Sequence, residues 1–598
     1  MERMKKSSVW DHFIKINDTD VRCTVCDRVL KYNSSTSSML YHLKARHFKG
    51  FTGENSRQSQ PAASTDMLDG RKCGKRRSQA ITQKIYRMIE KDMLPVDFVN
   101  AEGFVELLEF IEPNYKVPSH QTIASCIEEH FVEKKDELKA CLSGVECVTI
   151  ATDCWTALPT ENHVTVTCHW TDKDWQVKSA VLQTKTLPGR HSADNLAATL
   201  KEVVDDWGLT GRVLACVYDN ASNIMSAKVP VWVAVTCFAH ALQLVINDAF
   251  KPFVYKVISA AGKLVWYFSH NTIAAIALEA KQEQLQLPKH KLIQSSKTRW
   301  TSVFDMFERL LEQRWAVTAI LSDHTITAPQ DAETLEITDE FWAIMADLKP
   351  VLETLKCATT VMSSEKTVAI SYIYPITFSI INKHMANAAG DRPQVAEFKA
   401  AVRQSLSERM EVECNERLVS MPAMIASALD PRHKHLPFLS REKRQAVLCK
   451  LKDLCTELES APIEEDMDGD EEPGAADGEG GDAVMAGPSN GASLNESAMS
   501  MLLGDDYSMT DVKDPQCEVD TYAKDSRPSL QSNPLDWWRA NQTRFPRLAS
   551  LAGRFLCVPA TAVPPEEAFS AAGLETDRLR TRLTPEHVDM LVFLNRNK

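Results

Sequence analysis

Residues 148–170 (VTIATDCWTALPTENHVTVTCHW) constrain the fold of this chain more than any other stretch. A short β-branched run ends on Asp153, an alternating run follows at residues 163–167, and a third run follows at residues 177–182. β-branched residues between turn signals predict three consecutive strands. The sequence therefore predicts a carboxylate at the end of the first strand of a meander.

A second carboxylate follows downstream. Residues 212–218 (RVLACVY) read as a buried strand that ends on Asp219, and residues 192–207 between them predict an amphipathic helix. Three strands, a helix and a strand is the element order of an RNase H-like core, in which the first and fourth strands are neighbours. Asp153 and Asp219 would then lie side by side, which suits two-metal phosphodiester chemistry. The alternative is a pair of strand-end aspartates near a surface.

The most specific local motif lies near the N-terminus. Cys23-x2-Cys26 is followed by His42-x4-His47, which is the ligand spacing of a closed tetrahedral zinc site. A module this small cannot bury enough apolar surface alone, so Zn²⁺ is expected to supply most of its folding energy. The sixteen cysteines of the chain are interpreted as thiols and metal ligands in preference to disulfides.

With Trp10 and Phe13 ahead of the cysteines, the module resembles a BED-type zinc finger, which implies DNA binding. Its helix is expected to begin near Ser34 or Ser35 and to end near His47. By analogy with other two-Cys two-His fingers, the residues aimed at the major groove would be Ser35, Ser38 and Tyr41. Phosphate contacts would come from Lys31, Lys44, Arg46 and Lys49. A solvated basic face is the alternative for each lysine, and fingers also bind protein or RNA.

The net charge of −13 does not exclude a nucleic-acid partner, because the charge is uneven. Residues 464–482 hold ten acidic and no basic residues, whereas residues 1–50 hold ten Lys and Arg against five Asp and Glu. A split basic cluster at residues 71–77 is interpreted as a nuclear localisation signal, an extra phosphate contact or a solvated linker. The chain has no 18-residue apolar run and no apolar signal core at residues 1–13, so no membrane partner is expected.

Several motifs together resemble those of hAT-family transposases. They are TDCWT around Asp153, DNASN around Asp219, CFAHALQL around Cys237 and His240, and NPLDWWRANQ with LRTRLTPEHVDMLVFLN in the last 66 residues. Residues 565–570 (PEEAFS) align with the family pattern Ser-Glu-Arg-x-Phe-Ser, which implies that Glu566 completes an Asp-Asp-Glu set that holds Mg²⁺. For Cys237 and His240, a structural or DNA-proximal role is favoured over zinc.

A further motif at residues 297–302 (KTRWTS) resembles the family sequence at the start of its helical insertion. The resemblance implies that Trp300 stacks on a flipped base near the transposon end, where an aromatic face can replace lost base stacking. The alternative for a single tryptophan is packing in the core.

The resemblance implies a multidomain α/β fold in which a large all-helical insertion interrupts an RNase H-like mixed α/β core. The expected domains are a BED-type zinc finger (1–50), a basic linker (51–79), a helical domain (80–140), the first part of the core (143–250), the helical insertion (251–460), an acidic disordered loop (461–530), and a hAT C-terminal dimerisation region that completes the core (531–598).

Two functions remain open from the sequence. One is a nuclear zinc-dependent DNA-binding protein of hAT descent that forms a homo-oligomer through its C-terminal region and regulates transcription or chromatin without catalysis. The other is an active hAT transposase that cleaves and transfers DNA strands. Asp153, Asp219 and Glu566 favour the enzyme. Glu567, which replaces the family's Arg, and a short segment before Trp232 favour the regulator.

Overall fold

The structure is a computed structural model that divides into two units, Met1–Arg71 and Lys72–Lys598, each considered separately below. The described residues are 8–17, 19–32, 36, 38–39, 42–43, 47, 73–158, 161–187, 193–218, 232–296, 299–364, 367–413, 415–459, 518–562 and 584–597.

The smaller unit contains a three-stranded antiparallel sheet in the order β1-β2-β3. A 3-10 helix, η1 (Ser8–His12), leads into β1 (Phe13–Lys15), followed by β2 (Asp20–Cys23) and β3 (Val29–Lys31). Its buried residues come from η1, from the sheet and from the segment after it; they are Val9, Phe13, Val21, Cys23, Met39 and Leu43. Phe13 is buried and Trp10 packs edge-on against Tyr32, so both aromatics contribute to this core.

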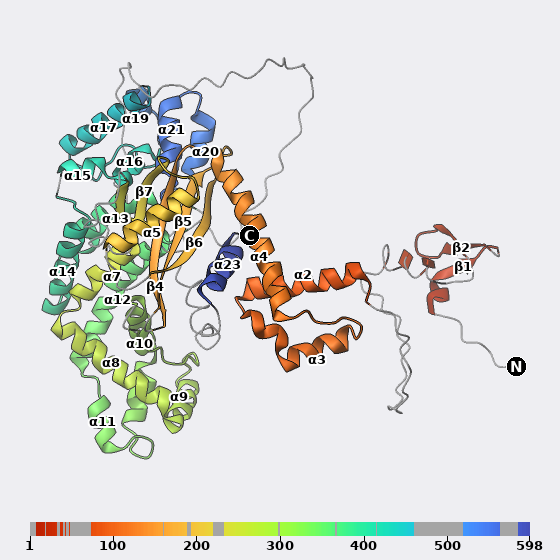
Figure 1. Cartoon of the computed structure of the whole chain (residues 1–598). Helices are drawn as coiled ribbons and strands as arrows, with labels where there is room; N and C mark the ends of the chain where they lie inside the picture. Colours follow the sequence, from red (N-terminus) through yellow and green to blue (C-terminus); the bar gives the residue numbers. More distant parts are fainter. Residues whose placement is uncertain are drawn as a thin grey trace. The chain divides into compact units, whose positions relative to one another are not determined.

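The larger unit is built on a five-stranded mixed sheet in the order β6-β5-β4-β7-β8 (Figure 1). Its strands are β4 (Val148–Leu158), β5 (Glu161–Thr171), β6 (Val177–Leu187), β7 (Val213–Tyr218) and β8 (Val233–Thr236). β4, β5 and β6 form an antiparallel meander, while β7 pairs parallel with β4 and with β8. The predicted adjacency of the first and fourth strands is confirmed.

Successive residues of β4 face two different cores, as the period of two in a strand requires. Val148 and Ile150 pack with α5 (Ala193–Asp206), which supplies Leu196, Leu200, Val203 and Val204 to the same core. Ala151, on the opposite face, packs with α7 (Phe238–Ala249) and the helices that follow. The sheet is therefore covered on both faces, and α5 lies across one of them (Figure 1).

Asp153 is not at the end of its strand, which corrects one expectation. β4 continues to Leu158, because its pairing with β5 extends through Leu158↔Glu161. Its parallel pairing with β7 stops at Thr152↔Tyr218. Asp153 therefore follows directly after the part of β4 that pairs on both sides, so it stands at the end of the parallel ladder.

The helices before the sheet are α2 (Lys75–Asp92), η2 (Val96–Asn100), α3 (Glu102–Ile111) and α4 (His120–Ser143). α4 begins where the Ser119 hydroxyl accepts a hydrogen bond from the Thr122 amide, as an N-cap does. The predicted basic linker is too long, because residues 75–77 form the first turn of α2. Ile85 and Ile89 are buried and anchor this helix.

A long helical region follows the sheet, in agreement with the predicted insertion. Its elements are α7, α8 (Pro252–His270), α9 (Thr272–Gln284), α10 (Thr301–Leu321), α11 (Pro329–Leu335), α12 (Asp339–Met362), η3 (Ile370–Tyr372), α13 (Ile373–Ser379), the π-helix η4 (Ile380–His384), α14 (Pro393–Arg409), α15 (Asn415–Ser420), α16 (Pro422–Leu429) and α17 (Arg441–Glu459).

The last described helices are α19 (Glu518–Lys524), α20 (Pro534–Asn541), α21 (Pro546–Phe555) and α23 (Pro585–Arg596). α23 packs against β6, α2 and α4 (Figure 1). The predicted disordered loop extends too far, because α19 buries Val519 and Tyr522 in the core. These two apolar side chains, three residues apart, share one helix face.

Candidate metal centre and strand-end carboxylate

Four side chains of the smaller unit converge on one point. The donor atoms of Cys23, Cys26, His42 and His47 all lie within 4.8 Å of one another. Cys26 Sγ lies 3.2 Å from His42 Nε2, Cys23 Sγ lies 3.6 Å from His47 Nε2, and the two Nε2 atoms are 3.1 Å apart. The structure therefore assembles the set that the spacing predicts.

The donor set fits Zn²⁺. Zn–S bonds of about 2.3 Å and Zn–N bonds of about 2.0–2.1 Å place the donors of a tetrahedral site about 3.3–3.8 Å apart. The three distances above are close to those edges. Thiolates and imidazoles are also the ligands that structural zinc sites use, and four of them leave no open position for a substrate. This centre is therefore suited to holding a fold together.

The local backbone explains how the cysteines come together. Cys23 is the last residue of β2, and the chain turns so that the Asp27 amide donates to the Cys23 carbonyl at 3.0 Å. Asp27 has φ 57°, a left-handed conformation that aspartate tolerates in turns. The His42 ring lies edge-on to Phe13, with centroids 5.9 Å apart, so the buried aromatic helps to hold a ligand.

Of the residues predicted to contact DNA bases, Ser38 is described and exposed, and its hydroxyl donates to the Lys31 carbonyl at 3.4 Å. Ser35, Tyr41, Lys44 and Arg46 lie outside the described residues. Lys31 is paired with Asp20 at 2.9 Å, and this hydrogen bond lowers the pKa of the Asp20 carboxyl. A phosphate at Lys31 would compete with that carboxylate.

Of the three predicted catalytic carboxylates, only Asp153 is among the described residues; Asp219 and Glu566 lie outside them. Asp153 is half-buried and faces Thr165 of β5 in register. Thr165 pairs in turn with Thr184 of β6, and their hydroxyl oxygens are 3.2 Å apart. The sheet therefore presents a polar row beside Asp153.

The described neighbours of the other two carboxylates lie close to this row. Tyr218, the last described residue before Asp219, pairs with Thr152. The Tyr218 carbonyl accepts from the Cys237 amide at 2.9 Å. Cys237 Sγ accepts from the amide of Ala562, four residues before Glu566, at 3.3 Å. Burial and this contact support the predicted structural role of Cys237.

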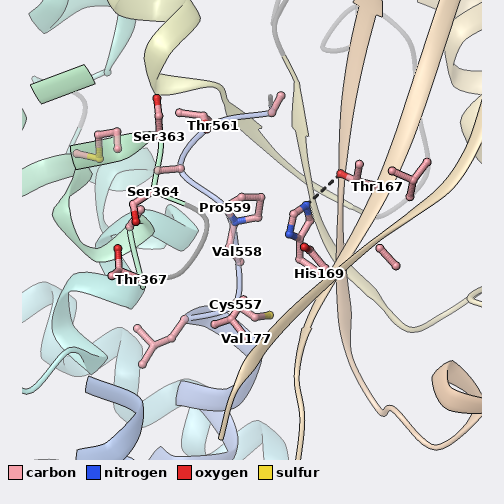
Figure 2. A pocket seen from close by; sticks show the side chains of 18 of the residues that line it. Thr167, His169, Val177, Ser363, Ser364, Thr367, Cys557, Val558, Pro559 and Thr561 are labelled. Carbon is pink, nitrogen blue, oxygen red and sulfur yellow. Dashed lines mark hydrogen bonds between the residues drawn. The ribbon is translucent and has the colours of Figure 1, made fainter. Parts of the chain in front are cut away.

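A cavity of about 130 Å³ lies where the segment from Leu556 to Ala562 crosses the sheet. Figure 2 shows His169 and Thr167 of β5 on one side of this segment, with Ser363 and Ser364 on the other. Thr167 Oγ1 lies 3.0 Å from His169 Nε2, and burial lowers the pKa of His169 to about 4. The imidazole is therefore neutral near pH 7.

The alternation of polar residues along β5 is a sequence signal for this polar surface. His163, Thr165, Thr167 and His169 alternate along β5 and so lie on one face of the sheet. Their β4 partners include Asp153, opposite Thr165. Polar residues that alternate with apolar ones along a buried strand predict a polar region on one face of the sheet.

Trp300 lies in the core in this structure. Its side chain is only 3% exposed, and its backbone amide donates to Gln243 Oε1 at 3.1 Å. It directly precedes α10, whose Val303, Phe304 and Phe307 are buried in the same core. With so little exposed surface, the ring offers no face on which a base could stack, and the burial agrees with the core-packing alternative.

Asp430 and Arg432 form a buried ion pair that no sequence motif indicates. Arg432 Nη2 lies 2.6 Å from Asp430 Oδ2, with side chains 6% and 0% exposed. Ser371 donates to the same carboxylate at 2.7 Å. Burial opposes ionisation of Asp430, but the charges of Arg432 and His433 and these hydrogen bonds lower its pKa to about 2.

This ion pair connects the helical region to residues 518–562, here called the C-terminal block. Arg432 Nη1 donates to the carbonyls of Leu530 and Ser532 at 3.4 and 3.3 Å. Lys434 Nζ donates to the Tyr522 carbonyl at 2.8 Å, and Trp538 Nε1 donates to the Leu429 carbonyl at 2.9 Å. The residues around Asp430 therefore fix both α19 and α20.

Comparison with known families matches four parts of the chain. They are a BED zinc finger at residues 7–48, a ZBED1 RNase-like domain at residues 151–231, a ZBED1 RNase-like helical domain at residues 235–348, and a hAT family C-terminal dimerisation region at residues 518–598. The chain carries the domains of BED zinc-finger proteins of the hAT transposase family. Their order agrees with the predicted mixed α/β layout.

Three relatives illustrate the range of this group. Zinc finger BED domain-containing protein 4 of Homo sapiens is 26% identical over 99% of this chain and 52% of its own length. A protein of Talaromyces stipitatus named as a candidate transcriptional regulator, tpeD, is 22% identical over 99% of this chain and 72% of its own. A Zea mays protein named as a candidate AC transposase is 23% identical over 85% and 64%.

The chain thus spans about half the length of the human relative. Among the described residues, no helix combines the length and apolar character needed to cross a membrane.

Proposed function

We propose that this chain is a nuclear zinc-dependent DNA-binding protein that self-associates through its C-terminal region and regulates transcription or chromatin. The observation that carries the proposal is the closed four-donor centre on a BED finger. Such a centre fixes a small module rigidly enough to present side chains to a DNA groove. The relative named as a transcriptional regulator supports the regulatory role.

Self-association is supported by the match of residues 518–598 to a dimerisation region. In this chain the region is anchored to the rest of the unit by the buried Trp538 and by the contacts of Arg432. A dimer would present two fingers to DNA, and two fingers predict a site with two related halves.

A selection from random duplex DNA tests the proposal. The full chain is expected to enrich one sequence pattern with two half-sites, because each finger of a dimer reads the same bases. The enriched duplex is expected to bind about 10³-fold more tightly than a scrambled duplex at the same salt concentration. Enrichment of no pattern over successive rounds would count against sequence-directed DNA binding.

The second candidate is an active transposase. Contacts of Tyr218, Cys237 and Ala562 link Asp153 to the residues that precede Asp219 and Glu566. These contacts support a shared location for the three carboxylates. Four residues span at most about 14 Å, so Glu566 is within reach of Cys237. The three carboxylates would hold Mg²⁺, whose chemistry is activation of water and then of a 3′ hydroxyl.

An excision assay tests this candidate. If the chain is a transposase, Asp153→Ala is expected to lower excision of a marker placed between the two transposon ends by about 10³-fold or more, because a metal ligand is lost. Asp174→Ala, at an exposed turn position after β5, is the matched control and should excise like the wild type. Equal background excision by all three proteins would eliminate the enzyme.

A further inference from the structure

The helix α2 carries six cations, Lys75, Arg76, Arg77, Lys84, Arg87 and Lys91. All six are exposed. An α-helix turns by about 100° per residue. All the cations except Lys75 therefore lie within an arc of about 100° around the helix axis, opposite the buried Ile85 and Ile89. The arc extends about 22 Å along the helix from Arg76 to Lys91. The exposed side of α2 is thus a continuous cationic face.

No acidic residue of α2 interrupts this face. Glu90 is 5% exposed and pairs with His130 at 2.9 Å, and Asp92 lies outside the arc. Arg77 forms an ion pair with Glu112. Across the part of the chain that the structure describes, the ion pairs include no partner for Arg76, Lys84 or Arg87. Among the described residues, most of the positive charge on this face is therefore not paired with a carboxylate.

Helix stability does not explain where these charges lie. Three of the cations occupy the first turn, where the helix dipole disfavours positive charge, and no acidic residue is present there. The helix is anchored on its other side, where it packs against α4 and α23. A charge arrangement that works against the helix, on a side with no packing role, is better explained by an anionic partner.

We propose that the cationic face of α2 binds the sugar–phosphate backbone of the duplex held by the zinc finger. This inference rests on the proposed DNA-binding function. Phosphates follow one another regularly along a DNA strand, and a line of cations about 22 Å long can meet several of them. Arginine and lysine side chains are the usual phosphate contacts, and such contacts carry no sequence information.

The order of the chain favours DNA over other polyanions. The finger match ends at residue 48 and α2 begins at Lys75, so the same polypeptide delivers both surfaces to one duplex. Binding by the finger makes the second contact intramolecular and raises its effective concentration. The face of α2 would then add affinity while the finger sets the sequence.

The test compares salt dependence in the full chain. The probe is a fluorescent duplex of about 30 base pairs with an arbitrary sequence, titrated between about 50 and 200 mM KCl. The triple variant R76Q/K84Q/R87Q is expected to reduce the slope of log K against log salt by about 2–3, or about 0.9 per lost phosphate contact. Its Tm should be unchanged or higher, because glutamine is a good helix former and repulsion in the first turn is relieved.

The matched control is K201Q/R403Q/R441Q, which removes the same charge from exposed positions on α5, α14 and α17. Its slope should stay near that of the wild type, and R76K/R87K should also keep the wild-type slope. An equal reduction of the slope in both triple variants would overturn the proposal, since net charge alone would then explain the reduction. If R76Q/K84Q/R87Q reduced the slope for duplex RNA but not for duplex DNA, the proposal would also be overturned.

Cys26→Ser distinguishes the α2 proposal from the proposed DNA binding by the finger. If R76Q/K84Q/R87Q binds the selected duplex like the wild type while Cys26→Ser does not, the α2 proposal is wrong and the finger's role stands. If Cys26→Ser keeps full affinity and sequence preference, DNA binding through the finger is wrong, whatever α2 contributes.

Discussion

Replacing Cys26 by serine is expected to abolish zinc binding by the finger and to lower affinity for the selected duplex by about 10³-fold, to the level of non-specific binding. Cys26 Sγ lies 3.2 Å from His42 Nε2, so one substitution removes a ligand from a four-donor centre. Apart from the ligand Cys23, the described part of the finger's core has five buried apolar residues, Val9, Phe13, Val21, Met39 and Leu43. Zinc contributes about 10–16 kcal/mol to folding of such modules, far more than this core can replace.

The measurement is a gel-shift titration together with the zinc content of the purified protein. Cys141→Ser is the matched control, because Cys141 is an exposed cysteine on α4 and belongs to no metal-binding group of the described residues. A chelator added to the wild type should reproduce the loss, and returning Zn²⁺ should reverse it. The Tm of the larger unit should not change. Full affinity without bound zinc would contradict the role of the centre.

The strands of the core were predictable because their signal is local. Residues of β4, β5 and β6 alternate between two faces over consecutive positions, and turn residues separate the strands. The length of β4 was not predictable in the same way. Its extension beyond Asp153 depends on pairing with β5, and propensity in Cys154-Trp155-Thr156 does not specify that partner.

The zinc centre was fully predictable, since metal geometry ties ligand identity to spacing. α2 shows the opposite case. Residues 75–77 were expected to belong to a basic linker, because the stretch around them is polar and basic. The helix forms there because its Ile85 and Ile89 face packs against α4 and α23, and α23 lies near the end of the chain.

Trp300 and Asp430 show why side-chain roles are harder to predict than elements. A motif placed Trp300 at DNA, yet the burial of its ring depends on helices spread over more than a hundred residues. Asp430 and Arg432 are adjacent enough in sequence to pair anywhere. The pair becomes a structural centre only because Arg432 also contacts Leu530 and Ser532, which lie 98 and 100 positions further along the chain.

Asp430→Ala is expected to destabilise the larger unit by about 3–5 kcal/mol, because it leaves the Arg432 guanidinium buried without its counter-charge. Arg432 would keep its two long contacts to the carbonyls of Leu530 and Ser532. Neutral carbonyls compensate a buried charge less well than a carboxylate does. Ser371 would lose its acceptor as well. The measurement is urea unfolding followed by fluorescence of the buried Trp538 and its neighbours.

Two further variants isolate the cause of this loss. Asp347→Ala removes an exposed ion pair with Arg392, in which the side chains are 41% and 48% exposed, and should cost less than about 1 kcal/mol. The double variant Asp430→Ala/Arg432→Met should recover part of the stability lost in the single variant, because no uncompensated charge remains. Equal losses for Asp430→Ala and Asp347→Ala would show that the buried pair does not hold the C-terminal block. Recovery in the double variant would show that the loss in Asp430→Ala comes from the uncompensated charge of the buried guanidinium.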